Sequence, residues 1–176
     1  MIDNNLIKIL NQGNILKYNN LKDSNMTKKK MTIQLIPVKK SDCSFLYELL
    51  EERNPKANIS HRKLPSYENH VKFVMSKPYS NWYIISNKNQ KFGSIYLSKQ
   101  DEIGIFIKKG TQTRGIGTKA IKLLMKKNLR PRYLANINPK NTKSKKFFKK
   151  NNFKLIQHTY ELLTSKSDTF ATKKKD

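Results

Sequence analysis

At 176 residues the chain is long enough for one domain with an extension, and its 37 Lys and Arg residues against 12 Asp and Glu give a formal net charge of +25. A surface of this charge would attract polyanions such as nucleic acid, an acidic membrane or a phosphorylated cofactor. Lysine is abundant throughout and the basic residues are scattered over several predicted elements. Nucleic acid is therefore a secondary expectation and not the main one.

The one cysteine, Cys43, excludes a disulfide within the chain and fits a reducing cytoplasm. Three scattered histidines and this distant cysteine show no recognisable metal-ligand spacing, so we expect no metal. No apolar run approaches the length of a membrane span, and polar residues interrupt the apolar ones at the N-terminus. These features predict a cytoplasmic protein with no membrane partner.

The first half of the chain predicts an extension, one strand and two helices. Residues 1–30 are weakly patterned, so we expect a loosely ordered N-terminal extension and a working domain over residues 31–176. The β-formers of Thr32–Val38 predict a strand, and Ser41 or Asp42 can cap a helix that continues to about Arg53. After a loop, Ser66 opens a second helix that ends near Lys77, before Pro78.

The second half predicts closely spaced strands and two more helices. Three strands in quick succession indicate an antiparallel meander: Asn81–Asn87, Lys91–Ser98 and Asp101–Ile107. Then follow a helix over Gly115–Lys127, a strand over Arg132–Asn138, a helix over Asn141–Lys150, and a closing hairpin of Phe153–Leu163 with about Thr169–Lys173. The fold class is α/β with a mixed sheet of the α+β kind, in the order β-α-α-β-β-β-α-β-α-β-β.

The segment Gln112-Thr113-Arg114-Gly115-Ile116-Gly117 joins a predicted strand to a predicted helix. Glycines at a helix N-terminus let backbone N–H groups approach a phosphate closely. A nucleotide P-loop would need Lys and then Ser or Thr after the second glycine, and Ile116-Gly117 stand there instead. A dinucleotide fingerprint would need Ala120 in place of its last glycine and has no clear acidic ribose partner. From this hexapeptide alone, a diphosphate-binding loop and an ordinary glycine-rich turn are both possible.

The same segment has the pattern Gln/Arg-x-x-Gly-x-Gly/Ala, which resembles the pyrophosphate loop of the GNAT superfamily of N-acetyltransferases. A second family signature follows at the expected place, with matches at Asn141, Ser144, Phe147 and Phe153. The resemblance covers about residues 31–174 and implies the GNAT fold with acetyl-CoA as co-substrate. Two positions depart from the family pattern: Phe148 stands where the usual general-acid Tyr would be, and Asn152 replaces a glycine.

The resemblance also implies which residues hold the cofactor. The strand before the glycine loop would supply backbone donors for the thioester, and the loop and the second signature would hold the diphosphate and the pantetheine arm. The implied cofactor-binding residues are Ile105, Phe106, Ile107, Gln112, Thr113, Arg114, Gly115, Ile116, Gly117, Thr118, Asn138, Asn141, Ser144 and Phe147. Lys108, Lys109 and Arg114 would add positive charge near the diphosphate.

Acetyl transfer to an amine needs a group that takes the amine proton. We expect Glu102 to do this, because it stands at the head of the strand before the glycine loop, as in many enzymes of the family. His61 is the second candidate, since an imidazole titrates in the useful range. Acceptor-binding residues are expected in the loop after the first helix and on the sheet: Arg53, Asn54, Arg62, Tyr67, Trp82 and Tyr96.

The function expected from these residues is acetyl-CoA-dependent N-acetylation of a small primary amine, such as an amino sugar, by direct attack in a ternary complex. The alternatives are acetylation of a protein or peptide, and a non-catalytic module that binds CoA or nucleic acid. Phe148 favours the non-catalytic alternative, because a phenyl ring has no proton to give. We expect a monomer or a homodimer.

Overall fold

The computed structural model describes residues 32–53, 63–88, 90–112 and 115–162, so the predicted extension of residues 1–30 lies outside the described residues. Four strands form an antiparallel sheet in chain order: β1 (Gln34–Pro37), β2 (Asn81–Ser86), β3 (Lys91–Leu97) and β4 (Ile103–Ile107). The predicted meander is confirmed, with Tyr96 opposite Gly104 in the β3–β4 pair.

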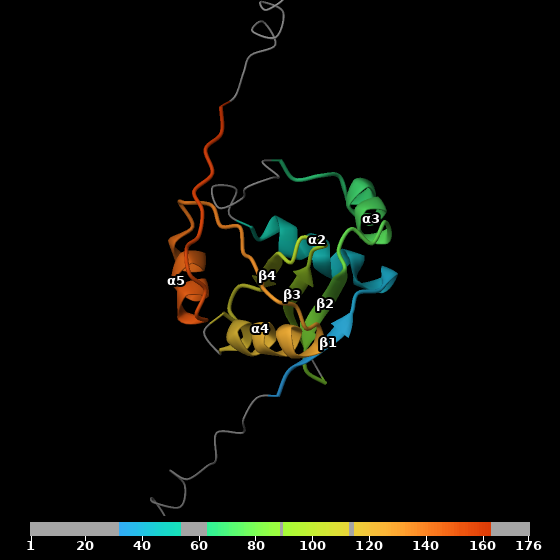
Figure 1. The fold of residues 1–176 in the computed structure, drawn as a ribbon. Helices are drawn as coiled ribbons and strands as arrows, with labels where there is room; N and C mark the ends of the chain where they lie inside the picture. The colour runs from blue at the N-terminus through green and yellow to red at the C-terminus, as the bar shows by residue number, and fades with distance from the viewer. Residues whose placement is uncertain (1–31, 54–62, 89, 113–114, 163–176) are drawn as a thin grey trace, which may run out of the picture.

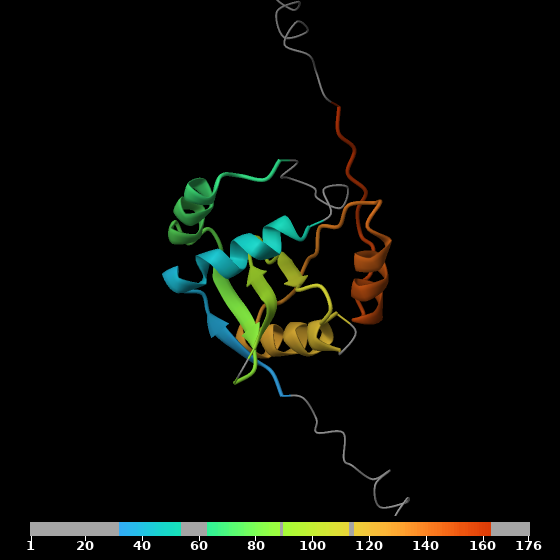
Figure 2. The same cartoon turned by 180° about the vertical axis from the view of Figure 1, so that it is seen from behind.

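Helices lie on both sides of this sheet (Figures 1 and 2). They are the short 3-10 helix η1 (Lys40–Asp42), α2 (Cys43–Glu51), α3 (Tyr67–Met75), α4 (Ile116–Lys127) and α5 (Thr142–Lys150). Helices α2 and α3 cover one face, α4 covers the other, and α5 stands at the side of the sheet next to α4. As the sequence predicts, Ser66 caps α3 by accepting a hydrogen bond from the Asn69 N–H at 3.3 Å. No helix among the described residues is long and apolar enough to span a membrane.

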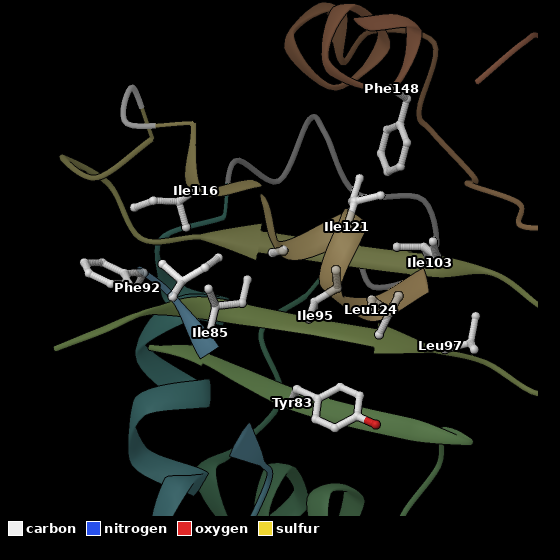
Figure 3. Close-up of a cluster of buried hydrophobic side chains, with 12 residues drawn as sticks. Tyr83, Ile85, Phe92, Ile95, Leu97, Ile103, Ile116, Ile121, Leu124 and Phe148 are labelled. Atoms are coloured by element: carbon white, nitrogen blue, oxygen red, sulfur yellow. The ribbon is translucent and has the colours of Figure 1, made fainter. Parts of the chain in front are cut away.

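Strand periodicity divides the sheet into two faces, because neighbouring side chains point to opposite sides. The face toward α4 carries the larger apolar cluster, whose fully buried members include Ile85, Phe92, Ile95 and Leu97. Ile121 and Leu124 of α4 close this cluster, and Phe148 reaches it from α5 (Figure 3). The face toward α2 carries a smaller cluster that includes Phe45, Leu46, Leu49 and Ile84.

The strand predicted over Arg132–Asn138 is not formed. Only Leu134 pairs there, in a single parallel bridge to Glu102, with hydrogen bonds from Ile103 N–H to Leu134 C=O at 2.8 Å and from Leu134 N–H to Asp101 C=O at 2.9 Å. Beyond this bridge the segment leaves β4, and its β-forming composition cannot make a strand without a partner. The edge of β4 from Gly104 to Ile107 is therefore not covered by a neighbouring strand within the described residues.

The closing hairpin is also not formed within the described residues. Residues 153–162 contain no strand, and the partner segment of residues 169–173 lies outside the described range. Leu155, Ile156, Tyr160 and Leu162 are each at least 74% exposed, so no sheet neighbour packs on them. The sequence predicted a strand here, but strands form by pairing and this segment has no described partner.

Candidate functional site

The start of α4 is built around Gly115, which occupies the N-cap position with φ of 68°. This left-handed conformation strains any residue with a Cβ, and a Cβ here would meet nothing within 4 Å. No described side chain caps the helix, and its first turn holds no acidic residue. The first backbone N–H groups of a helix have no intrahelical partner, so this end of α4 offers donors and partial positive charge to an anion.

The turn before α4 is tied to β4 and to α2. Gln112 Nε2 donates to the Ile107 carbonyl at 3.2 Å, so this predicted cofactor residue closes the turn with its side chain. Lys108 Nζ lies 3.2 Å from Glu48 Oε2, and the Lys109 N–H donates to Glu52 Oε2 at 2.8 Å. The positive charge that Lys108 was expected to add near the diphosphate is therefore partly neutralised by its ion pair with Glu48 of α2. Thr113 and Arg114 lie outside the described residues.

Gly117 is buried and makes room for a side chain of α5. A Cβ at this position would lie 2.9 Å from Phe147 Cε2 and 3.0 Å from Phe147 Cζ. The sequence predicts that this glycine admits a ligand, whereas its surroundings show that it admits the phenyl ring. Ile116 is fully buried in the core, so only its backbone remains for the predicted cofactor contact. Thr118, the next predicted residue, is half-buried on the first turn of α4.

The uncovered edge of β4 presents backbone groups to one side. In an antiparallel pair, alternate residues direct their N–H and C=O groups toward and away from the partner strand. Ile103 and Ile107 direct theirs away from β3, toward Leu134 and Gln112 respectively. Ile105 has the same parity, and nothing in the described part of the chain accepts from the N–H groups of Ile105 or Ile107. These are two free donors in a row, next to the start of α4.

Helix α5 carries the second predicted signature at its start. Asn141 is the N-cap of α5, and its Oδ1 accepts from the Ser144 N–H at 3.0 Å. Asn138 Oδ1 accepts from the Lys140 N–H at 2.9 Å, which shapes the turn before the helix. These bonds give both asparagines a structural role. Asn152, which replaces a family glycine, has φ of 66°, as expected for a left-handed position.

Phe148 is a core residue. Its ring is 7% exposed and packs edge-on against Phe147 and Phe153, with ring centroids 5.2 Å and 5.1 Å apart. Figure 3 shows it pointing from α5 toward Ile121 and Ile103. The position that would carry a general-acid Tyr is therefore filled by an apolar ring that contributes to packing. A leaving thiolate would depart without a proton from this residue, which an ordinary thiol pKa of about 8.5 permits.

Glu102 stands where β4 and the segment after α4 separate. Its carboxylate accepts from Asn136 Nδ2 at 2.6 Å and from the Ser98 hydroxyl at 3.4 Å. Its neighbour Asp101 has φ of 63° and pairs with Arg130 Nε at 3.1 Å, so only Glu102 is directed to this place. Glu102 has the parity of Gly104 and Phe106, which places it on the α2 face of the sheet.

Aromatic rings gather on this same face. Tyr96 lies across Gly104, at which a Cβ would overlap its ring, and it stacks on Tyr79 with centroids 3.8 Å apart. Trp82 meets Tyr79 edge-on at 5.0 Å, and its Nε1 is buried with no hydrogen-bond partner among the described residues. Phe73 meets both Tyr79 and Trp82. Burial raises the pKa of the Tyr79 hydroxyl, and Tyr96 adds to this effect, so Tyr79 is a neutral hydrogen-bonding group.

The remaining predicted acceptor residues are divided. Arg53 Cζ lies 5.4 Å from the centre of the Phe106 ring, which places a guanidinium beside the aromatic face. Tyr67 packs instead against Tyr47 and His70, in a separate group of rings at the junction of α2 and α3. The other predicted residues of this loop, Asn54, His61 and Arg62, lie outside the described residues. The second candidate base, His61, therefore stays a prediction.

His70 and Cys43 are buried residues that join α3 to α2. His70 is 3% exposed and its Nε2 lies 3.2 Å from the Cys43 carbonyl oxygen, which links α3 to the start of α2. Burial lowers the pKa of His70, although the Cys43 carbonyl opposes the shift. The described residues hold no group of His, Cys, Asp and Glu arranged to bind a metal ion.

No protein-family model matches the sequence, and no curated protein is detectably similar to it. Solved structures are similar in fold. A domain from Methanocaldococcus jannaschii DSM 2661 is 26% identical, with a TM-score of 0.63 over 74% of this chain and 93% of its own. RimL, a ribosomal L7/L12 alpha-N-protein acetyltransferase in complex with coenzyme A, is 18% identical, with a TM-score of 0.60 over 72% and 82%. A mutant of the spermidine N-acetyltransferase SpeG from Vibrio cholerae is 13% identical, with a TM-score of 0.57 over 72% and 81%.

The chain has the GNAT acetyltransferase fold. This confirms the predicted fold class, although the two regions named above do not form strands within the described residues. The fold arranges three features along β4: Glu102 at its start, its uncovered edge, and the open start of α4 after its end.

Three residues beside this place were not predicted from the sequence. Tyr79 follows Pro78 in a connection, and nothing in its local pattern indicates that it stacks on Tyr96. Asn136 and Ser98 contact Glu102 through side chains, which no spacing rule predicts. The one sequence signal that could have suggested Asn136 and Ser98 is that both are polar residues near the ends of the strands predicted around Glu102.

Proposed function

We propose that this protein is an acetyl-CoA-dependent N-acetyltransferase that acts on a primary amine of a small molecule. The observation that carries the proposal is the uncovered edge of β4. There the N–H groups of Ile105 and Ile107 point away from β3, next to the uncapped, glycine-initiated N-terminus of α4. An extended pantetheine arm along this edge would find donors for its amides and thioester, and its diphosphate would meet the start of α4.

The chemistry follows from this arrangement. The thioester carbonyl oxygen gains negative charge as the amine attacks, and a backbone N–H of the β4 edge would stabilise that charge. The amine would approach from the α2 face, where Tyr96, Trp82 and Arg53 gather. Binding both molecules on one strand aligns the nitrogen with the carbonyl carbon, so the acetyl group passes directly in a ternary complex.

The acceptor is best described by the surface around it. The rings of Tyr79, Tyr96 and Trp82 are half-buried and would pack on the body of a small molecule. The guanidinium of Arg53 would suit oxygen atoms on that molecule. An amine that also carries hydroxyl, carboxylate or phosphate groups, as in an amino sugar, meets both requirements.

A protein N-terminus is the second candidate acceptor, and the similarity to RimL favours it. The two candidates differ in what the aromatic face would bind, since a peptide would extend beyond it. An amine panel of glucosamine 6-phosphate, spermidine and a short peptide with a free N-terminus separates them. Acetylation of the peptide alone would replace the small-molecule acceptor by a protein.

Calorimetric titration of acetyl-CoA into the purified protein tests the cofactor site. We expect micromolar affinity in the wild type and at least a tenfold loss in Gly115→Glu, because a side chain and a negative charge would then stand at the start of α4. Gly110→Glu is the matched control, since Gly110 also has positive φ (78°) with nothing near its Cβ position but lies five positions before the N-cap of α4. A well-folded wild type that does not bind acetyl-CoA would refute the proposal.

A further inference from the structure

Glu102 differs from the other carboxylates of the described residues in what holds it. Most of them pair with a cation: Asp42 with Lys91, Glu48 with Lys108, Glu68 with Lys72 and Asp101 with Arg130. Glu102 instead accepts from a neutral amide and a neutral hydroxyl, and no described Lys or Arg forms an ion pair with it. Among the described residues, Glu102 is therefore oriented by neutral donors and not by a cation.

The hydroxyl donor is fixed by its own bonds. Ser98 is 7% exposed at the end of β3, and its Oγ accepts from the Glu102 N–H at 3.1 Å and from the Gln100 N–H at 3.2 Å. With its acceptor sites occupied, the hydroxyl has its proton left to donate, and Glu102 Oε2 lies 3.4 Å away. Ser98 therefore orients one oxygen of the carboxylate.

The amide donor comes from the segment that leaves β4. Asn136 lies two residues beyond the Leu134 bridge, and its Nδ2 reaches back to Glu102 Oε1 at 2.6 Å. The two donors thus come from opposite sides of β4, one directly after β3 and one on the departing segment. Each oxygen of Glu102 has one of them, so the carboxylate is held in one orientation at the point where the edge of β4 becomes free.

We propose that Ser98 and Asn136 are positioning residues that hold Glu102 to take the proton of the acceptor amine. This inference rests on the proposed acetyl transfer. Glu102 lies on the face of Tyr96 and Phe106, and Ile105 is three residues further along the strand, about 10 Å at the usual rise. A proton would cover such a distance through a chain of water molecules.

The step balances without another reactant. The amine nitrogen forms a bond to the thioester carbonyl carbon while its proton passes through water to the Glu102 carboxylate. The C–S bond then breaks, with its electron pair going to sulfur, and an amide and the CoA thiolate result. Glu102 returns the proton to the medium, and the thiolate is protonated from there because Phe148 has no proton to give.

The test compares Glu102→Gln, Asn136→Ala and Ser98→Ala with wild type, using the panel amine that turns over fastest. We expect kcat to fall about 100-fold for Glu102→Gln and about tenfold for Asn136→Ala, with the KM for acetyl-CoA unchanged. The deficits should shrink as the pH approaches about 10, where a free amine loses its own proton. Asn87→Ala is the control, because the Asn87 side chain also accepts a short bond, from the Gln90 N–H at 2.8 Å, in the turn at the opposite end of β3 from Ser98.

A merely structural role for Asn136 would lower stability without changing the shape of the pH profile of kcat. Wild-type kcat and pH profile in Asn136→Ala, or full activity in Glu102→Gln, would overturn this inference and leave the proposed acetyl transfer in place. Absence of acetyl-CoA binding, or of turnover with every amine of the panel, would remove the proposed function and this inference together. The two failures are therefore distinguishable.

Discussion

The two faces of one sheet are filled in different ways. The face toward α4 is packed with aliphatic side chains and Phe92, and Leu97 and Leu124 there are fully buried. The face toward α2 has a smaller apolar cluster and, beside it, the half-buried rings of Tyr79 and Tyr96 with polar atoms at their edges. The same strands supply both faces, so strand alternation separates the stabilising side from the side proposed to meet the acceptor, except at Phe92, which lies at the register shift between β2 and β3.

This difference suggests that stability and activity respond to different substitutions. A residue pointing to α4 contributes to stability by burial, whereas one pointing to α2 near β4 is proposed to contribute contact surface for a ligand. Glu102 belongs to the second kind although it is only one residue from Ile103, which is 4% exposed in the larger cluster. The substitutions below test this separation.

The largest expected effect on stability is at Leu124, at the centre of the α4 face. Leu124→Ala should lower the free energy of unfolding by about 3 kcal/mol, through lost burial and the cavity left behind. Urea unfolding measures it, and Lys122→Ala, exposed on the same helix, is the control. A loss below about 1 kcal/mol would show that this face is not the main source of stability.

A smaller effect is expected on the α2 face at Gly104. Gly104→Ala places a Cβ in the ring of Tyr96, and overpacking of this kind costs about 1–3 kcal/mol. Tyr96→Ala should remove the clash, so the double variant should be more stable than Gly104→Ala alone. A double-mutant cycle by urea unfolding gives the coupling. Simple additivity would mean that the ring does not lie across Gly104.

The smallest effect concerns His70 and appears only in mild acid. Burial lowers the folded-state pKa of His70 below the unfolded value of about 6.5, so the unfolded chain binds the proton more readily. The free energy of unfolding should therefore be fully retained above about pH 6.5 and fall as the pH drops through the window below it. His70→Gln keeps a donor for the Cys43 carbonyl and should show a shallower decline between pH 7.5 and 5.5. Identical slopes would contradict the assignment.

Much of the fold follows from local sequence signals. Hydrophobic periodicity predicts the helices and the meander, Ser66 predicts the start of α3, and Asn152 is acceptable in its left-handed position because Asn tolerates positive φ. The start of α4 at Gly115 was also predictable, since a glycine before a helical pattern is visible in the sequence without knowledge of the tertiary structure. These features depend on residues close together in the chain.

The rest depends on contacts between distant residues. Whether residues 132–138 pair along their length is decided by where they leave β4, and only Leu134 stays. The bond from Asn136 to Glu102 spans 34 positions, and the stack of Tyr79 on Tyr96 spans a strand and a turn. Local propensity contains no information about such contacts, which is why Glu102 was predicted as a candidate base without the residues that hold it.

The contact of Gly117 with Phe147 has an evolutionary consequence. Because the ring occupies the space of the missing side chain, the two positions form one steric unit across α4 and α5. A lineage that acquires Ala or Ser at position 117 would have to accept a smaller residue at position 147, or lose the approach of α5 to α4. The two sites should therefore covary among homologues, and a covariation signal between them would record this shared volume.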